Sequence, residues 1–558
     1  MQQLDYHPIL KRIFLSRKVS SPEQLATGAA GLLSYTTLKG MDRAVELLAT
    51  ALEQQQAISI VGDFDADGAT STALCLLALT AMGAKHVDHV VPNRFEYGYG
   101  LTPQIVDVVH QRGGQVIVTV DNGIACHAGV AHAKALGMTV IVTDHHLPSE
   151  TLPNADAIVN PNQPNCQFAS KTLAGVGVAF YLMVALRAHL QQMQWFAQQQ
   201  ITAPNMAQYL DLVALGTVAD VVTLDHNNRI LVYQGLQRIR ARQCRPGILA
   251  LLDVAQRNAS GLTSTDLGFV LGPRLNAAGR LDDMSMGIAC LITDSLQHAR
   301  SIAIELDRLN QERKQIEQSM QQDVLATIPA LDTEEYHSSN GVVLYQADFH
   351  AGVIGIVAGR IKDKLHRPTI IFAEENDTQL KGSARSISGV HIRDVLALVD
   401  SRNPSLLIKY GGHAMAAGLS IAKADFEHFC QAFEDALSQW QSQIQQEQAI
   451  YSDGELPVDC FSLEFAEQLK HIIPWGQGFR EPLFDGVFTL VQQRIVGEKH
   501  LKMVLKAENG DYLDAIAFNV DTARWPASEQ TEVQLAYRLD VNEFRNKRNL
   551  QLLVEALD

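Results

Sequence analysis

Residues 58–68 read Ile58-Ser59-Ile60-Val61-Gly62-Asp63-Phe64-Asp65-Ala66-Asp67-Gly68. Four residues rich in isoleucine and valine are followed at once by a turn with three alternating aspartates. Similar β-branched runs occur at residues 87–91, 116–120, 140–142 and 157–159, and amphipathic stretches separate them. This alternation predicts a parallel sheet covered by helices between residues 58 and 222.

Three of these runs end directly in turns that carry carboxylates. The turns are residues 62–68, Asp121-Asn122-Gly123 and Asp144-His145-His146. In open α/β sheets the carboxyl ends of the parallel strands form the binding crevice. We therefore expect the three turns to converge at one edge of the sheet.

The aspartate-rich turn has two interpretations when it is taken alone. Asp63, Asp65 and Asp67 repel one another unless cations neutralise them or some of them become protonated. The turn is therefore either a metal-binding segment or a solvated, calcium-type loop, and a short motif alone favours neither.

Two further segments favour a metal. Asp121 and the triplet 144–146 add a mixed carboxylate and imidazole set, which suits Mn²⁺, Mg²⁺ or Fe²⁺ better than a thiolate zinc site or an all-oxygen calcium site. In isolation, the two histidines would be ordinary polar residues at a helix start. Asp220 lies in the apolar run 214–222, where a single carboxylate is either a helix N-cap or a metal ligand.

Taken in this order, the four motifs resemble those of the DHH phosphoesterase superfamily. Within it, the chain resembles the RecJ exonucleases over nearly its whole length. The segments outside the metal motifs that carry this resemblance are residues 91–100, 271–280, 352–360 and 411–413. One departure is Phe349 before His350, where the family has tryptophan.

The resemblance implies an α/β fold with a parallel-sheet DHH phosphoesterase domain, a long connecting helix, a second α/β DHH-associated domain and a C-terminal oligonucleotide-binding (OB) type β-barrel. The sequence agrees, because residues 295–328 lack proline and glycine and the last hundred residues have short strand-like runs. The expected parts are an N-terminal segment 1–50, the catalytic domain 51–290, the connecting helix 291–335, the nucleic-acid-binding domain 336–440 and the barrel 450–558.

The resemblance also implies a two-metal site for Mn²⁺ or Mg²⁺. Its ligands would be Asp63, Asp65 and Asp121 for one ion, and Asp67, Asp121, His145 and Asp220 for the other. Asp121 would bridge the two ions, and His146 would contact the scissile phosphate. The implied activity is a single-stranded-DNA-specific exonuclease that works from the 5′ end in DNA repair and recombination, releases nucleoside monophosphates and forms no covalent intermediate.

Residues that grip the strand are expected in the second α/β domain. Ser383 and Arg385 lie two apart on one strand face and, with Arg280, are expected to hold the 5′ phosphate; a surface strand with a solvated arginine is the alternative. The glycines of Gly411-Gly412-His413 would let backbone amides approach a phosphate, unless the segment is only a tight turn. By resemblance, His350 is also assigned to the substrate.

The barrel is expected to bind bases and backbone together. Aromatic residues next to cations are suited to stacking on bases while the cations follow the phosphates. We expect Phe544, Arg545 and Arg548, beside a turn at residues 545–549, to serve this purpose. Tyr537 is expected to be a core residue of the barrel instead.

Composition sets limits on these expectations. The chain has 558 residues, a formal net charge of −16 and seven scattered cysteines. The spacing of the cysteines excludes a Cys-x-x-Cys zinc site and argues against a disulfide framework. The sequence has neither a signal peptide nor an apolar run long enough for a bilayer, so we expect a cytoplasmic protein with no membrane contact. We also expect a monomer. The acidic charge opposes DNA binding unless metal ions reverse the local field.

Two other classes of function remain open. Members of the superfamily that act on small substrates include oligoribonucleases, cyclic-dinucleotide phosphodiesterases and pyrophosphatases, but these need neither a long helix nor a barrel. A scaffold protein that had lost the metals should lack ligand residues, and every candidate position here holds Asp or His. By resemblance, the expected partners are single-stranded DNA, a single-strand-binding protein and a RecQ-type helicase.

Overall fold

The structure is a computed structural model that describes residues 6–93, 99–330, 339–444, 449–522, 524–526, 531–544 and 547–558; for residues 327–330 and 544 it describes only the backbone. The chain divides into two compact units. The first comprises Met1–Gly279, Asp283–Asp307 and Ile450–Asp558, and the second comprises Arg280–Asp282 and Arg308–Ala449.

A five-stranded parallel sheet forms the centre of the catalytic part of the first unit. Its strands are β1 (Ile58–Val61), β2 (Val87–Val90), β3 (Val116–Val120), β4 (Thr139–Thr143) and β5 (Ala157–Val159), in the order β2-β1-β3-β4-β5. Every residue of β1 and β3 is buried, which explains their isoleucine and valine content. The order changes direction between β1 and β3, and ligands in such sheets bind at this switch point.

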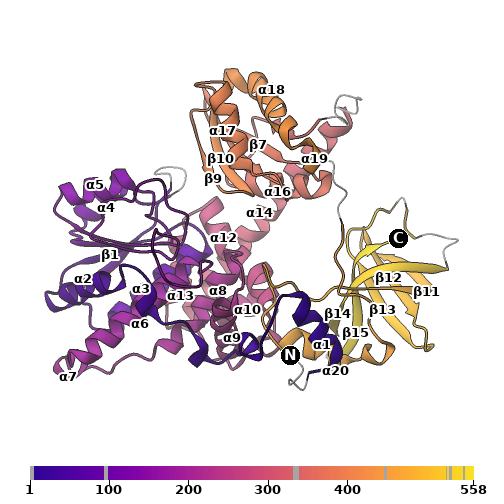
Figure 1. Ribbon diagram of the computed structural model, residues 1–558, viewed down its shortest axis with the longest axis horizontal. Helices are drawn as coiled ribbons and strands as arrows, with labels where there is room; N and C mark the ends of the chain where they lie inside the picture. Colours follow the sequence, from indigo (N-terminus) through magenta and orange to yellow (C-terminus); the bar gives the residue numbers. More distant parts are fainter. Residues whose placement is uncertain are drawn as a thin grey trace. The chain divides into compact units, whose positions relative to one another are not determined.

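Helices cover both faces of this sheet. Figure 1 shows α4 and α5 on one face and α2, α3 and α6 on the other. The helices of this part are α1 (Pro8–Ser16), α2 (Met41–Glu53), α3 (Ala66–Ala81), α4 (Pro103–Gln111), α5 (His127–Ala135), α6 (Gly175–Gln192), α7 (Trp195–Gln198), α8 (Leu210–Ala219), α9 (His226–Arg240), α10 (Pro246–Val254), α11 (Ser264–Asp266), α12 (Gly272–Leu281) and α13 (Ser285–Ile292).

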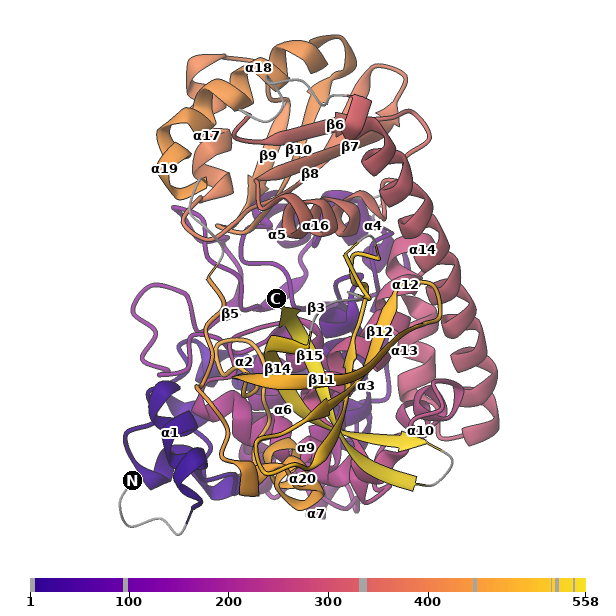
Figure 2. The ribbon, with the colours of Figure 1, turned by 90° about the vertical axis from the view of Figure 1, so that its right-hand side faces the viewer.

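The predicted connecting helix is α14 (Leu296–Ala330), which Figure 2 shows as one continuous helix. Its first part belongs to the first unit, where Arg274 binds Asp307 at 2.8 Å. Its second part belongs to the second unit, where Glu317 accepts hydrogen bonds from Arg313 and Arg360. The Arg274–Asp307 and Arg360–Glu317 ion pairs therefore tie the two halves of the helix to their own units.

The second unit contains a mixed sheet in the order β6-β7-β8-β10-β9. Its elements are β6 (Val342–Tyr345), α16 (Ile354–Leu365), β7 (Thr369–Asn376), β8 (Gln379–Arg385), α17 (Ile392–Arg402), β9 (Lys409–Gly412), β10 (Ala416–Ala422), α18 (Phe426–Leu437) and α19 (Gln441–Ile444). β6 and β7 are parallel, and the other pairs are antiparallel. Phe372, Phe429 and Phe433 lie in the core beneath this sheet.

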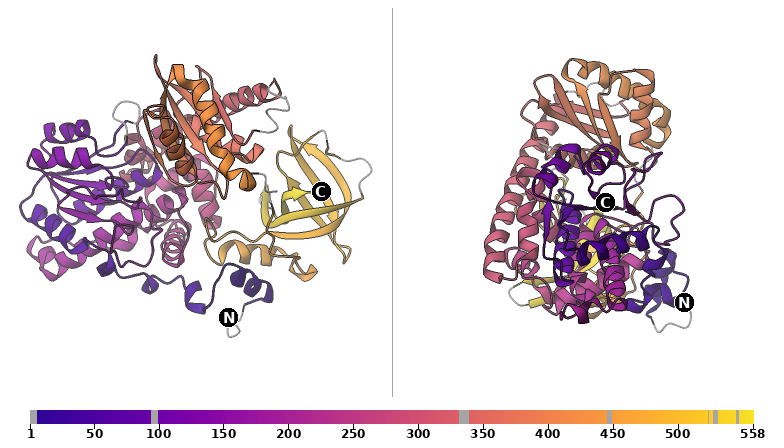
Figure 3. Two further views of the ribbon diagram at one scale, coloured as in Figure 1. Left: turned by 45° about the horizontal axis from the view of Figure 1, so that its top comes forward. Right: turned by 90° about the vertical axis from the view of Figure 1, so that its left-hand side faces the viewer.

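The last part of the chain is a closed five-stranded barrel, seen in Figure 3. Its elements are α20 (Leu463–His471), β11 (Phe484–Val496), β12 (His500–Lys506), β13 (Tyr512–Ala517), β14 (Glu532–Phe544) and β15 (Lys547–Leu557). Tyr537 is buried in the barrel core, as expected. Of the turn predicted at residues 545–549, Lys547 to Asn549 belong to β15, and residues 545 and 546 lie outside the described residues. Together with the second sheet and α14, the barrel confirms the predicted fold class.

Candidate metal centre

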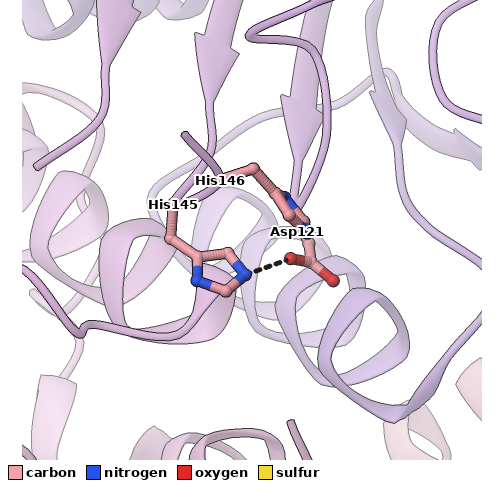
Figure 4. A group of neighbouring side chains, drawn as sticks. All are labelled: Asp121, His145 and His146. Atoms are coloured by element: carbon pink, nitrogen blue, oxygen red, sulfur yellow. Dashed lines mark ion pairs between the residues drawn. The ribbon is translucent and has the colours of Figure 1, made fainter. Parts of the chain in front are cut away.

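The ends of β3 and β4 bring Asp121 and His145 into contact. Nε2 of His145 lies 3.1 Å from Oδ1 of Asp121, as Figure 4 shows, and 3.5 Å from Oδ2 of Asp220. These three residues are far apart in the sequence. The carboxyl edge of the sheet therefore gathers the predicted turns at one place.

Three overlapping groups of side chains lie close enough to share an ion. Within each group, one ligand atom per residue lies within 4.8 Å of the others. The groups are Asp63, Asp65 and Asp121; Asp67, His145 and Asp220; and Asp121, His145 and His146. All six predicted metal ligands are thus brought together, and His146 joins them.

Backbone amides hold the carboxylates of the aspartate-rich turn. Asp65 is the N-cap of α3 and accepts a hydrogen bond from the Gly68 amide at 3.0 Å. Asp67 accepts hydrogen bonds from the amides of Gly175 and Val176 at 2.6 and 2.9 Å. The positive end of the α6 dipole thus faces Asp67 and fixes its orientation.

The backbone at Asp121 is in the left-handed region, with φ of 62°. This conformation is uncommon for residues other than glycine, and such strain clusters at functional sites. A Cβ on Gly175 would lie 2.6 Å from the Cβ of Asp121. Glycine at position 175 is therefore needed so that α6 can approach Asp121.

Asp220 corrects one expectation from the sequence. It stands at the C-terminal end of α8, so it is not an N-cap. The C-terminal end of a helix carries the negative end of its dipole, which disfavours a carboxylate. Burial and the neighbouring charges of Asp67 and Asp65 raise the pKa of Asp220 well above its usual value.

The electrostatics of the cluster fit a bound cation. Burial, followed by repulsion from Asp67 and Asp65, raises the pKa of Asp121 well above its usual value, and burial raises the pKa of Asp67 to about 7. Oδ1 of Asp121 and Oδ2 of Asp220 are buried, and no residue that the structure describes donates a hydrogen bond to either. Carboxylate and imidazole donors of this kind suit Mn²⁺ or Mg²⁺.

Asp144 is a functional residue to which no role was assigned from the sequence. Its carboxylate accepts hydrogen bonds from the amides of Ile124, His145 and His146 and contacts Nδ1 of His146 at 2.7 Å. It therefore fixes the positions of both histidines. Aspartate side chains often accept hydrogen bonds from the backbone amides that follow them, so the position of Asp144 directly before the two histidines could have indicated this role in the sequence.

Asp144 and His146 change each other's ionisation. Burial alone would raise the pKa of Asp144, but the hydrogen bond and charge of His146 outweigh it and lower the pKa. Burial alone would lower the pKa of His146, but Asp144 raises it to about 9. In the metal-free protein, Asp144 therefore favours the protonated, positively charged form of His146.

Other polar contacts around the centre were also missed. The Tyr99 hydroxyl donates to the Asp121 carbonyl at 3.3 Å. The side-chain amides of Asn160 and Asn162 donate to the carbonyls of His146 and His145 at 2.9 and 2.6 Å. Only the folded backbone brings these residues together, so spacing in the sequence gives no sign of them.

In the second unit, Ser383 and Arg385 face the first turn of α16. A Cβ on Gly355 would lie 2.8 Å from Nη2 of Arg385 and 2.9 Å from Oγ of Ser383. Burial lowers the pKa of Arg385, and among the described residues no carboxylate forms an ion pair with it. A half-buried guanidinium beside helix amides is a suitable environment for an anion.

The other predicted contacts of this unit lie at its loops. Arg280 donates to the Gly352 carbonyl at 3.1 Å, and Nδ1 of His350 accepts from the Gly352 amide at 3.1 Å. At the sheet edge, Gly412 has φ of 145° and a Cβ there would lie 2.4 Å from the Ala416 carbonyl oxygen. Glycine at position 412 is therefore required by both its conformation and its packing.

The adjoining residues of this loop differ from Gly412. A Cβ on Gly411 would meet no atom within 4 Å, so this edge is open. The amide of His413 donates to the Ala416 carbonyl at 2.8 Å. The segment 411–413, which includes the end of β9, is therefore a tight turn with one open side, and its binding of a phosphate stays a prediction.

The role predicted for the barrel hairpin stays a prediction. Arg548 forms an ion pair with Glu467 at 2.7 Å, whereas Arg545 and the Phe544 side chain lie outside the described residues. The outer face of β12 and β13 instead combines cations with aromatic rings. Lys502 and Lys506 belong to β12, Tyr512 begins β13 opposite Lys506, and Phe518 directly follows the last residue of β13.

Two further features are separate from the metal centre. A cavity of about 610 Å³ lies between the C-terminal half of α3 and the edge strand β2, and it contains none of the predicted site residues. Because the cavity contains none of these residues, the carboxylate cluster is the candidate for chemistry.

Across the described ranges, no helix combines the length and apolarity needed to span a bilayer.

Comparison with known families covers most of the chain. Residues 57–217 match the N-terminal domain of the DHH family, residues 338–439 match the DHHA1 domain, and residues 452–556 match the RecJ OB domain. These matches fall on the parallel sheet, the second unit and the barrel.

Individual relatives are similar over most of their length. The single-stranded-DNA-specific exonuclease RecJ of Salmonella typhimurium is 54% identical over 552 residues, which cover 99% of this chain and 96% of that protein. The enzyme of the same name from Escherichia coli strain K12 is 54% identical over 98% of this chain and 95% of that protein. The crystal structure of RecJ in complex with Mn²⁺ from Thermus thermophilus has a TM-score of 0.81 and 30% identity, covering 100% of this chain and 77% of that chain.

Proposed function

The chain belongs to the RecJ family of single-stranded-DNA-specific exonucleases, and we propose that it hydrolyses single-stranded DNA from the 5′ end and releases nucleoside monophosphates in DNA repair and recombination. The observation that carries this proposal is the convergence of Asp121, His145 and Asp220 with the aspartate-rich turn at one sheet edge.

The cofactor is Mn²⁺ or Mg²⁺, which are the ions named in complexes of related enzymes. One ion would be held by Asp63, Asp65 and Asp121, and the other by Asp67, Asp121, His145 and Asp220. When bound, two ions lower the pKa of water and stabilise charge on the attacking and leaving oxygens. The carboxylates hold these ions, so the chain needs no nucleophile of its own.

His146 is assigned to the scissile phosphate. Its Nδ1 contacts Asp144, and the pKa of about 9 keeps the ring charged at neutral pH. A positive ring beside the carboxylates would bind a phosphodiester anion and stabilise the added charge of the transition state. Asp144 is a positioning residue in this scheme.

The 5′ end would be held by the second unit. Arg385 and Ser383 face the N-terminal turn of α16, and a half-buried cation without a carboxylate partner among the described residues would be stabilised by a terminal phosphate. Arg280 and His350 flank the loop around Gly352, and residues 411–413 form the open edge. We assign these groups to the leading nucleotides.

The outer face of the barrel would bind the rest of the strand. Lys502 lies opposite Arg494 in the register of β11 and β12. Like charges directly opposite each other destabilise a sheet, and a polyanion removes that cost. Phe518 and Tyr512 could stack on bases beside these cations. Strand binding by the hairpin residues Phe544, Arg545 and Arg548 stays a secondary prediction.

The test uses Mn²⁺ and oligonucleotides labelled at either end, with duplex, RNA and dinucleotide controls. We expect the first labelled product from a 5′-labelled single strand to be a mononucleotide. Equal rates on duplex and single strand would contradict the specificity, and early mononucleotides from the 3′ label would contradict the polarity. Preferred cleavage of dinucleotides would favour the small-substrate members of the superfamily.

Other expectations from the sequence and from the resemblance stay predictions. They are a monomeric state, a cytoplasmic location, a single-strand-binding protein and a RecQ-type helicase. The domain limits given for the sequence, from 1–50 to 450–558, are likewise retained as our proposal for the organisation of the chain.

A further inference from the structure

A π-helical turn, η6 (Leu267–Leu271), lies against the last turn of α8. Turns of this type are rare and are frequently found at functional sites. A Cβ on Gly268 would lie 3.2 Å from Cγ1 of Val218, and a Cβ on Gly272 would lie 3.1 Å from Cβ of Ala219. The turn therefore packs closely against the residues that directly precede Asp220.

Phe269 extends from this turn into solvent. Its side chain is 81% exposed, the highest value for any large apolar residue in the ranges that the structure describes. The glycine at position 268 keeps the backbone beneath the ring close to α8. The exposed ring is therefore carried by a turn that packs against the two residues preceding Asp220.

Two other exposed apolar side chains belong to the segments that hold the metal ligands. Leu147 follows His146 directly and is 61% exposed, and Val221 follows Asp220 and is 64% exposed. Val221 has φ of 62°, which is unfavourable for a β-branched residue. Single exposed apolar residues are ordinary on a surface, but three on the segments around one charged centre are not.

We propose that Phe269, with Leu147 and Val221, forms an apolar platform on which a base of the single-stranded substrate stacks beside the metal centre. This proposal rests on the proposed function. Phe269 would act as a positioning residue for DNA. The base faces of a single strand are available for stacking, whereas those of a duplex are already covered, so the platform would also favour single strands.

A docking site for another protein is the alternative. A base is favoured because the carboxylate cluster brings a phosphodiester to this place, and each phosphodiester carries a base within a few bonds. Leu147 and Val221 also directly follow site residues in the sequence. They are therefore located where a nucleotide must lie during cleavage.

The test measures kcat and KM on 5′-phosphorylated single strands in which one abasic nucleotide is placed in turn at each position near the 5′ end. The variants are Phe269→Ala, Phe269→Tyr and Phe269→Trp. The matched control is Tyr451→Ala, which removes another highly exposed aromatic ring from the segment before the barrel. Intact strands serve as the reference for each variant.

We expect one position at which loss of the base raises KM for the wild-type enzyme. Phe269→Ala should raise KM for the intact strand roughly fivefold to 150-fold and should remove the sensitivity at that position. The Tyr and Trp variants should retain it, and Tyr451→Ala should behave like the wild type.

An abasic profile of Phe269→Ala identical to that of the wild type would overturn the platform, and a protein-docking residue would give that result. A wild-type enzyme that releases no nucleotides would instead refute the proposed function, so the two failures are distinct.

Discussion

The sheet edge that holds the metal ligands and the outer face of the barrel both present charged groups, but the two are built in opposite ways. At the sheet edge, Asp67 and Asp121 are buried, and backbone amides and close packing fix the carboxylates. On the barrel, Lys502 and Arg494 are more accessible and lie on one open face. If the proposed roles hold, chemistry depends on a few residues with fixed geometry, whereas strand binding is spread over many weak contacts.

The largest effect is expected from Asp121→Ala. This change removes the carboxylate common to both implied metal sites, so several kcal/mol of transition-state stabilisation should be lost and kcat should fall about a thousandfold or more. Binding of single-stranded DNA should stay close to the wild-type value, because the barrel and the second unit are untouched. Single-turnover assays and fluorescence anisotropy measure the two quantities, and a nearly active variant would exclude a bridging role for Asp121.

Metal addition should stabilise the folded protein by about 3 kcal/mol at a hundredfold excess over Kd. The raised pKa of Asp67, about 7, gives a stability contribution that is present at low pH and lost as the pH rises through that value. The raised pKa of His146, about 9, acts in the same direction. The metal-free protein should therefore be less stable at pH 8 than at pH 6.

Because divalent ions compete with these protons, the rise in Tm caused by Mg²⁺ should be larger at pH 8 than at pH 6. Differential scanning calorimetry at both pH values measures it. Asp121→Ala provides the control and should show a reduced response. Equal increments at the two pH values would show that metal binding is not linked to the carboxylate cluster.

The sheet edge with its buried carboxylates could largely be predicted from the sequence. The strands β1 and β3 and the carboxylate turns after them follow from β-branched runs that end in aspartates, and the sheet rule predicts their convergence. The place of Asp220 could not be predicted, because no glycine or proline between Asp220 and Val222 marks the end of α8. Only the left-handed backbone at Val221 shows that the helix has ended.

The proposed strand-binding face of the barrel could not be predicted from the sequence. The sequence suggested that Arg548 is free to bind a phosphate, but its side chain forms an ion pair with Glu467, which is far from it in the chain. The cations on β12 became recognisable only through the register with β11 and β13. Charged contacts between distant segments depend on tertiary structure, so local patterns do not reveal them.

Next in size is the expected effect of Arg385→Ala on the preference for a 5′ phosphate. A hydrogen bond to a charged group contributes about 1.5–3 kcal/mol, so kcat/KM for 5′-phosphorylated strands should fall roughly tenfold to 150-fold. Strands that end in a 5′ hydroxyl should be cut at nearly unchanged rates. Arg393→Ala removes an exposed cation from α17 in the same unit and should leave both rates unchanged. An equal loss on both substrates would place Arg385 outside the phosphate site.

The smallest effect is expected from Lys502→Ala, and it tests the distributed half of the comparison. One phosphate contact on a single strand should change the slope of log K against log salt by about 0.7 and lower the affinity only a few-fold at moderate salt. In the described part of the barrel, Lys502 forms no ion pair, whereas Arg548 is paired with Glu467. Arg548→Ala should therefore change the slope less than Lys502→Ala, although it removes the same charge. A larger effect of Arg548→Ala would contradict this prediction and would show that the hairpin, rather than the face of β12, binds the strand. In that case, replacing Glu467 as well as Arg548 should not restore the affinity for single-stranded DNA.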